Sequence, residues 1–334
     1  MRLGYVTPFS LPEHRRVTLD YARIAEEGGY EAVWVPEAWS SDAFTLLGAI
    51  ASHTSRLQLA TGIVNIFSRT PSLLAQTFAT LDEMSNGRAI VGLGTSGQQV
   101  VERWHGVPFD RPLRRMREVV DILRLAFSGQ RVDYEGEFFK LSGFTMLIKP
   151  VRERMPIYLA TFKPQSLRMT GEIANGWLPT HLSLAHLPAM RADLAAGEAK
   201  AGRSVGSVDL AAQTLTAVSD NGDEARLHCA QHLAYYVGGM GTYYHELMHA
   251  YGYGEEADRI QSRWKAKDRE GAARQVSRAM LDALVIAGTR DECLEAIAKR
   301  KAAGIEHIVI FPPHGASVAE VTRTMTALAP AALS

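Results

Sequence analysis

The chain has 334 residues, of which 46% are hydrophobic, and its 36 basic and 36 acidic side chains give a formal net charge of zero. This balance lacks the net positive charge typical of nucleic-acid-binding proteins, and no apolar run is long enough to span a membrane. The two cysteines form neither a metal-binding pattern nor a disulfide framework. Because the N-terminus leads straight into a strand-like segment, we expect no signal peptide and a cytoplasmic location.

Short apolar runs alternate with amphipathic segments in the first hundred residues. The runs 3–6, 32–35, 57–60 and 89–91 predict buried strands, and helices are predicted over 16–27, 43–51 and 72–84. Asp42 is placed to cap the second helix, and Pro71 suits the first position of the third. Nearly all-apolar strands joined by helices predict a parallel sheet whose faces are covered by helices.

The alternation continues to the C-terminus. Strands are predicted over 156–160, 176–180, 208–218 and 307–311, and helices over 114–127, 165–173, 187–201, 291–303 and 318–329. Two segments interrupt it: a hairpin excursion at about 130–150, and a mostly helical insertion at about 222–282 after the seventh strand. We predict an α/β fold, a (β/α)8 TIM barrel forming a single domain over 1–334, with an open doubly wound sheet as the alternative.

The first four predicted strands end in polar or small residues, namely Thr7, Glu37, Thr61 and Thr95. In a TIM barrel the carboxyl ends of all strands lie at one face, and loops at that face build the active site. We therefore expect the chemistry of this chain at these strand ends.

Gly92, Gly94 and Gly97 match G-x-G-x-x-G, the pattern of dinucleotide-binding loops. That motif needs a helix that begins at its last glycine and an acidic residue about 20 positions later. Gly106 and Pro108 follow too soon for such a helix, so we do not expect a dinucleotide site. We predict instead that the glycines let a ligand approach the backbone closely.

His245, Glu246 and His249 match H-E-x-x-H, in which two imidazoles on one helix face bind zinc and the glutamate acts as base. Glu255, Glu256 and Glu270 are the candidates for a third ligand. Because short patterns arise by accident and a barrel places its chemistry at the strand ends, we predict that the chain binds no metal.

Six segments, mostly at or near the strand ends, form a recognisable set: 37–39, 42–44, 60–63, 81–88, 94–97 and 104–106. In these segments the chain resembles the bacterial-luciferase-like flavin and deazaflavin oxidoreductases. The likeness is closest to the branch that uses coenzyme F420, such as methylene-tetrahydromethanopterin reductase, and it covers nearly the whole chain. The resemblance implies a TIM barrel that pairs as a homodimer and binds F420 at its mouth.

In the family, a non-prolyl cis peptide supports the central ring of the cofactor, and the matching bond here is Gly62–Ile63. The cofactor phosphate would lie on backbone amides after the fifth strand, near Lys163. Many relatives have two glycines where this chain has Phe162 and Lys163. The cofactor-binding residues that the resemblance implies are Thr7, Glu37, Thr61, Gly62, Ile63, Thr95, Ser96, Gly97, Ala160, Thr161, Phe162, Lys163 and Thr180.

The resemblance also implies catalytic and substrate-binding residues. Glu37 and His105 are the candidate proton donors, and Trp39 and Trp104 would wall the substrate pocket. Each has a structural alternative: an ion-paired carboxylate, a structural histidine or a core tryptophan. The expected reaction is hydride transfer between reduced F420 and a small molecule with a C=C, C=N or C=O bond. The alternatives are an FMN-dependent luciferase-like monooxygenase, a zinc hydrolase built on the H-E-x-x-H motif and a barrel that binds without a cofactor.

Overall fold

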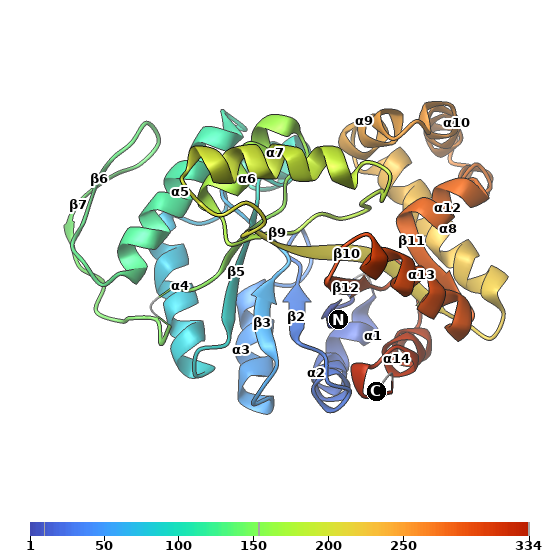
Figure 1. Ribbon diagram of the computed structural model, residues 1–334, viewed down its shortest axis with the longest axis horizontal. Coiled ribbons are helices and arrows are strands. Elements are labelled where there is room, and N and C mark those ends of the chain that lie inside the picture. The colour runs from blue at the N-terminus through green and yellow to red at the C-terminus, as the bar shows by residue number, and fades with distance from the viewer. Residues whose placement is uncertain (10, 153, 333–334) are drawn as a thin grey trace.

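The computed structural model describes residues 1–9, 11–152 and 154–332, and its centre is a closed barrel of eight parallel strands (Figure 1). The order around the barrel is β12-β1-β2-β3-β5-β8-β9-β10, and β10 closes it by pairing with both β9 and β12. The predicted TIM barrel is confirmed, and closure rules out the open sheet. The barrel strands are β1 (Arg2–Val6), β2 (Ala32–Val35), β3 (Gln58–Thr61), β5 (Ala89–Gly94), β8 (Ile157–Leu159), β9 (Gly176–Trp177), β10 (Asp209–Val218) and β12 (His307–Phe311).

Two further strands extend the sheet, and two form a separate hairpin. β4 (Val64–Asn65) pairs with the end of β5, and β11 (Val285–Gly288) pairs with the last residues of β10. The predicted excursion is an antiparallel hairpin of β6 (Val132–Glu135) and β7 (Lys140–Phe144), which projects from the body at the left of Figure 1.

Helices surround the barrel. Those outside the long insertion are α1 (Pro12–Arg16), α2 (Thr18–Glu27), α3 (Ala43–His53), α4 (Pro71–Met84), η1 (Val100–Trp104), α5 (Pro112–Phe127), α6 (Pro164–Ile173), α7 (Leu187–Lys200), α13 (Arg290–Ala302), α14 (Val318–Ala327) and η2 (Pro330–Ala332). Between β10 and β11 lie α8 (Gly222–Gly239), α9 (Tyr243–Ala250), α10 (Gly254–Lys265), α11 (Arg269–Ala273) and α12 (Arg278–Leu284). Among the described helices, none combines the length and apolarity that crossing a membrane requires.

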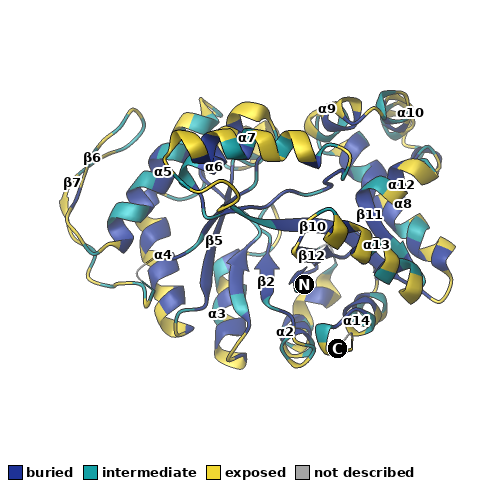
Figure 2. Cartoon of the chain, viewed as in Figure 1, coloured by how far each residue is buried: buried dark blue, intermediate teal, exposed yellow. Residues whose placement is uncertain are grey.

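Local sequence explains where several helices begin. The Asp42 side chain accepts a hydrogen bond from the Thr45 amide at 2.7 Å, as its predicted role as a cap requires. Thr289 and Ser317 each form a capping box with the acidic residue three positions later. The barrel strands and the inner faces of the helices are mostly buried, whereas the outer helix faces and much of the β6–β7 hairpin are exposed (Figure 2).

Two local features add to the predicted pattern. The helix expected over 16–27 is α2, which begins at Thr18 because the backbone at Val17 leaves helical geometry and separates α2 from the short helix α1. A short helical segment, η1, does follow Gly97, and the Val100 amide donates to the carbonyl oxygen of Gly97 at 3.0 Å. It ends before Gly106, whose φ of 68° only glycine adopts readily, so it is much shorter than the helix of a dinucleotide site.

Candidate active site

The amino end of the barrel is closed by packing and ion pairing. Asp209 is ion-paired with Arg2 and accepts a hydrogen bond from the Tyr158 hydroxyl at 2.6 Å. Burial alone would raise the pKa of Asp209, but hydrogen bonds, including those from Arg2 and Tyr158, lower it below its ordinary range. Tyr158 also packs edge-on against the fully buried Trp34, with ring centroids 5.3 Å apart. A ligand therefore has to enter from the opposite end.

The carboxyl end brings together the loops after β3, β5 and β8, which are neighbours in the sheet. The peptide bond between Gly62 and Ile63 is cis, as the resemblance implied. A Cβ placed on Gly94 would lie 2.8 Å from Cγ1 of Ile63 and 3.7 Å from Cβ of Ala160, so the three loops meet directly. The predicted cofactor-binding residues of these loops thus share one rim.

The glycines of the G-x-G-x-x-G pattern have different surroundings. A Cβ on Gly92 would lie 1.8 Å from the carbonyl oxygen of Thr61, so this position needs glycine for the close approach of two strands. The Thr61 hydroxyl donates to the Gly92 carbonyl at 2.7 Å and accepts from its amide at 2.9 Å. A Cβ on Gly97 would meet no atom within 4 Å. Gly92 therefore serves barrel packing, and the Thr61 hydroxyl is occupied within the protein.

Glu37 and His105 line the same open pocket, of about 320 Å³, at the ends of β2 and β4. Arg69 holds the Glu37 carboxylate through two hydrogen bonds, of 2.5 and 2.9 Å, and the Ala43 amide donates a third at 3.0 Å. Hydrogen bonding to Glu37 raises the pKa of Arg69. Glu37 is therefore an ion-paired carboxylate held in place by its neighbours, which is the structural role that the sequence analysis gave as the alternative to a catalytic one. The pocket is lined by Glu37, Ala38, Ser40, Ser41, Asp42, Ser68, Arg69 and His105.

His105 and the two tryptophans lie at this rim. His105 is half-buried. The side-chain Nδ2 of Asn65 donates a hydrogen bond to Nε2 of His105 at 3.2 Å. Trp39 is 48% exposed and Trp104 is 65% exposed, so neither is a core residue. The rim therefore presents two aromatic surfaces to solvent, and their predicted contact with substrate stays a prediction.

The loop after β8 has the geometry expected of an anion site only in part. The Ala160 amide donates a hydrogen bond to the carbonyl oxygen of Leu93 on β5. The Thr161 hydroxyl is hydrogen-bonded to the Thr170 hydroxyl at 2.8 Å. The first hydrogen bond of α6 runs from the Leu167 amide to the Lys163 carbonyl, so the amides just before Leu167 make none of the helix's own bonds. Those amides could hold a phosphate, as helix N-termini do.

A group of buried polar atoms without partners lies at the mouth beside β9 and β10. Among the described residues, nothing hydrogen-bonds to either ring nitrogen of His181, to Nε2 of His232 or to the hydroxyl of Thr180. Both histidines are only 1% exposed. The ring centroid of Tyr236 lies 5.0 Å from that of His181 and 4.5 Å from that of His232. The ring centroid of Tyr244 lies 5.7 Å from that of His181. Such atoms are costly to bury unless a ligand or water completes them.

Comparison with known proteins then settles the family. Residues 1–307 match the family model described as luciferase-like monooxygenase. The chain belongs to this luciferase-like family. It is 33% identical to a putative coenzyme F420-dependent oxidoreductase of Mycobacterium tuberculosis, over 91% of this chain and 92% of that protein. It is 29% identical to a 5,10-methylenetetrahydromethanopterin reductase of Archaeoglobus fulgidus, with the same two coverages.

Solved structures show the same fold. The F420-dependent tetrahydromethanopterin reductase of Methanopyrus kandleri superposes with a TM-score of 0.87 at 24% identity, over 99% of this chain and 98% of that one. The FMN-bound oxygenating constituent of 3,6-diketocamphane monooxygenase from Pseudomonas putida superposes with a TM-score of 0.76 at 17% identity, over 99% of this chain and 97% of that one. The family barrel therefore accommodates enzymes with either cofactor.

Reasoning from sequence named Thr180 in this luciferase-like barrel but missed His181 and His232. His181 directly follows Thr180 at the end of the sixth barrel strand, so the strand-end rule could have found it. His232 lies in α8, within the helical insertion, where no motif marks it. Its position at the mouth depends on how α8 folds back over the barrel, which periodicity does not predict.

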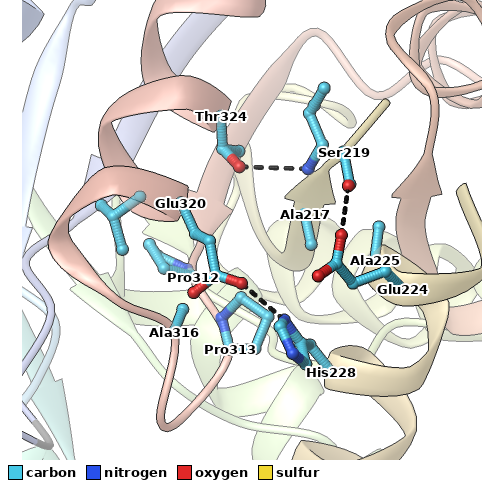
Figure 3. A pocket seen from close by; sticks show the side chains of 12 residues that line it. Ala217, Ser219, Glu224, Ala225, His228, Pro312, Pro313, Ala316, Glu320 and Thr324 are labelled. Atoms are coloured by element: carbon cyan, nitrogen blue, oxygen red, sulfur yellow. Dashed lines mark hydrogen bonds and ion pairs between the residues drawn. The ribbon is translucent and has the colours of Figure 1, made fainter. Parts of the chain in front are cut away.

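A second hollow in this luciferase-like chain lies between α8 and α14 at the end of β10 (Figure 3). Its volume is about 10 Å³, enough for about one water molecule. Its polar groups are already paired, since Glu320 faces His228 at 3.2 Å and Ser219 donates to Glu224 at 2.7 Å. It is too small for a flavin ring and is not a candidate site.

Folding stability of this luciferase-like chain should fall as the pH falls from 6.5 to about 4. Burial lowers the pKa of His181 from 6.5 to about 4, so in this window the unfolded chain binds a proton that the folded chain excludes. His232, whose pKa burial also lowers, acts in the same direction. The loss from His181 alone would be about 3 kcal/mol. Urea unfolding at pH 7, 5.5 and 4.5 tests this, and a constant free energy of unfolding would contradict it.

Proposed function

We propose that the protein transfers a hydride between the deazaflavin coenzyme F420 and an unsaturated small molecule with a C=C, C=N or C=O bond. The observation that carries the proposal is the set of buried, unpartnered polar atoms of Thr180 and His181 at the barrel mouth. The choice of F420 is supported by the relative that is 33% identical over nine-tenths of both chains. FMN in a luciferase-like monooxygenase is the alternative, supported by the family name and by the FMN-bound neighbour.

The residues present fit a molecule with a polar ring and a phosphate tail. The Thr180 hydroxyl and the ring nitrogens of His181 offer hydrogen bonds that no described protein group takes. The free amides that precede Leu167 at the start of α6 suit the phosphate. Lys163 lies beside them, although its ammonium group is 3.6 Å from the Glu246 carboxylate, so phosphate binding would compete with that ion pair.

When bound, F420 would supply the hydride chemistry, while the protein would supply binding, orientation and a dry cavity. Tyr236 and Tyr244 pack against the apolar cluster of the barrel interior and exclude water from the mouth. Because its pKa is about 4, His181 is neutral at pH 7. It would therefore donate a hydrogen bond that orients substrate, rather than deliver a proton. At the other side of the rim His105 remains the proposed proton-donor candidate, whereas the Glu37 carboxylate, the other candidate, is already taken up by hydrogen bonds from Arg69 and the Ala43 amide.

Titration of the purified protein with F420 and with FMN tests this proposal. We expect the fluorescence of F420 to be quenched when the protein binds it, with saturation at one equivalent per chain. FMN should bind at least about tenfold more weakly. Tight FMN binding with no response to F420 would support the monooxygenase, and binding of neither would support a cofactor-free barrel. A homodimer is proposed from the family likeness alone, and sedimentation of the purified protein would test it. A cytoplasmic location is proposed from the two free cysteines, which fit a reducing compartment.

A further inference from the structure

The H-E-x-x-H segment has no part in the proposed hydride transfer, yet the structure gives it a third partner. His245 and His249 lie one turn apart on α9, with ring centroids 4.7 Å apart. Asp258, on α10, approaches both rings: its Oδ1 is 2.9 Å from Nε2 of His245 and 3.0 Å from Nε2 of His249. Three side chains from two helices therefore direct one nitrogen or oxygen each toward a common point.

We propose that His245, His249 and Asp258 bind a divalent transition-metal ion such as Zn²⁺, with water in its remaining coordination positions. Two imidazole nitrogens and one carboxylate oxygen suit zinc, nickel or cobalt, whereas calcium and magnesium prefer oxygen ligands alone.

The geometry is close to what such an ion needs. The three ligand atoms lie within 4.8 Å of one another. Bonds of about 2.1 Å at tetrahedral angles place two ligand atoms about 3.4 Å apart, so a shift of at most about 1.4 Å between a pair of ligand atoms completes the site. The His249 side chain is 45% exposed and that of Asp258 is 62% exposed, which leaves both free to adjust. Each imidazole would bind the ion through Nε2 in the tautomer that carries its proton on Nδ1.

The site differs from that of a zinc peptidase. Glu246, the base in the peptidase motif, extends toward Lys163, with an oxygen 3.6 Å from the Lys163 ammonium. The third ligand is Asp258 and none of the candidates from the sequence, Glu255, Glu256 and Glu270. Of these, Glu255 and Glu270 are each ion-paired with the arginine four residues later in the chain. With no base beside the proposed ion, we assign it a structural role.

That role follows from where α9 lies. On another side of this helix, Tyr244 packs against Tyr236 with ring centroids 4.8 Å apart, and Tyr243 packs against Phe162 at 6.3 Å. These contacts place α9 against the barrel mouth, at the upper right in Figure 1. An ion shared by His249 and Asp258 would tie α9 to α10 and hold the aromatic cover of the mouth in place.

Titration of chelator-treated protein with Co²⁺, followed by its visible absorption and by competition with Zn²⁺, tests the site. We expect one Co²⁺ per chain, displaced by one equivalent of Zn²⁺. His249→Ala and Asp258→Asn should each weaken binding by more than about tenfold. Glu246→Gln should bind as the unmodified protein does. His53→Ala, which removes an exposed histidine at the end of α3, is the matched control and should also leave binding unchanged.

A saturating Co²⁺ signal that His249→Ala and Asp258→Asn leave intact would overturn the proposal, as would the absence of saturable binding. Equal weakening by Glu246→Gln would overturn the assigned ligand set. All four substitutions are at side chains that are at least partly exposed, and circular dichroism would verify that each variant folds. The measurement uses the metal alone, so its outcome is independent of whether the protein binds F420.

Discussion

Gly92→Ala is expected to destabilise the folded protein by about 3 kcal/mol or more. The added Cβ would lie 1.8 Å from the carbonyl oxygen of Thr61, which belongs to the neighbouring barrel strand. Neither atom can turn away by a change of side-chain rotamer, so β3 and β5 would have to separate. Overpacking that side chains can absorb costs about 1–3 kcal/mol, and a clash between two backbones exceeds that range.

Two other glycines of the same motif provide a graded comparison. A Cβ on Gly94 would meet the flexible side chain of Ile63 at 2.8 Å, so Gly94→Ala should cost about 1–2 kcal/mol. Gly97→Ala, in open space, should stay within about 0.5 kcal/mol of the unmodified protein. Urea unfolding of the three variants measures the order. If Gly92→Ala were as stable as Gly97→Ala, packing would not explain why glycine stands at position 92.

The contrast among these glycines shows how far the sequence alone could be followed. The strand–helix alternation predicted the barrel, and strand ends predicted which residues share a rim, since parallel strands all end at the same face. The pattern of three glycines could not separate a ligand-binding role from a packing role. That distinction depends on Thr61, which is 31 residues from Gly92 and adjacent to it only after the sheet forms.

The same limit applies to the side chains at the mouth. Glu37 was found from the sequence, but Arg69, which holds its carboxylate, was not, because the pair is separated by 32 residues and marked by no motif. His232 and Asp258 were missed for a similar reason: each acts across two elements that lie side by side only in the folded chain. Sequence spacing predicts neighbours within one helix or strand, whereas pairing between elements depends on tertiary packing.

His181→Phe is expected to stabilise the protein by about 1 kcal/mol and to lower kcat/KM by about 100-fold. The substitution keeps an aromatic ring of similar size between Tyr236 and Tyr244 and removes two buried nitrogens that no described group pairs with. Burying an unpaired polar group costs about 1–3 kcal/mol, so its removal should be favourable. Loss of one hydrogen bond made to the transition state costs about 100-fold in rate.

His14→Phe is the matched control, because His14 is equally buried, at 1% exposure, but fully paired. Its nitrogens lie 2.9 Å from the Tyr21 hydroxyl and 2.9 Å from the Ala316 carbonyl oxygen. Phenylalanine there would leave both partners buried without a hydrogen bond, so stability should fall by about 2 kcal/mol. Urea unfolding and assay with F420 and a reducible acceptor measure both properties of each variant.

The two histidines should therefore respond with opposite signs. A paired buried histidine stabilises the fold, whereas an unpaired one costs stability unless a ligand or water completes its hydrogen bonds. If His181→Phe lost stability as His14→Phe does and kept full activity, His181 would be a structural residue. The hydrogen-bonding role proposed for it at the barrel mouth would then be wrong.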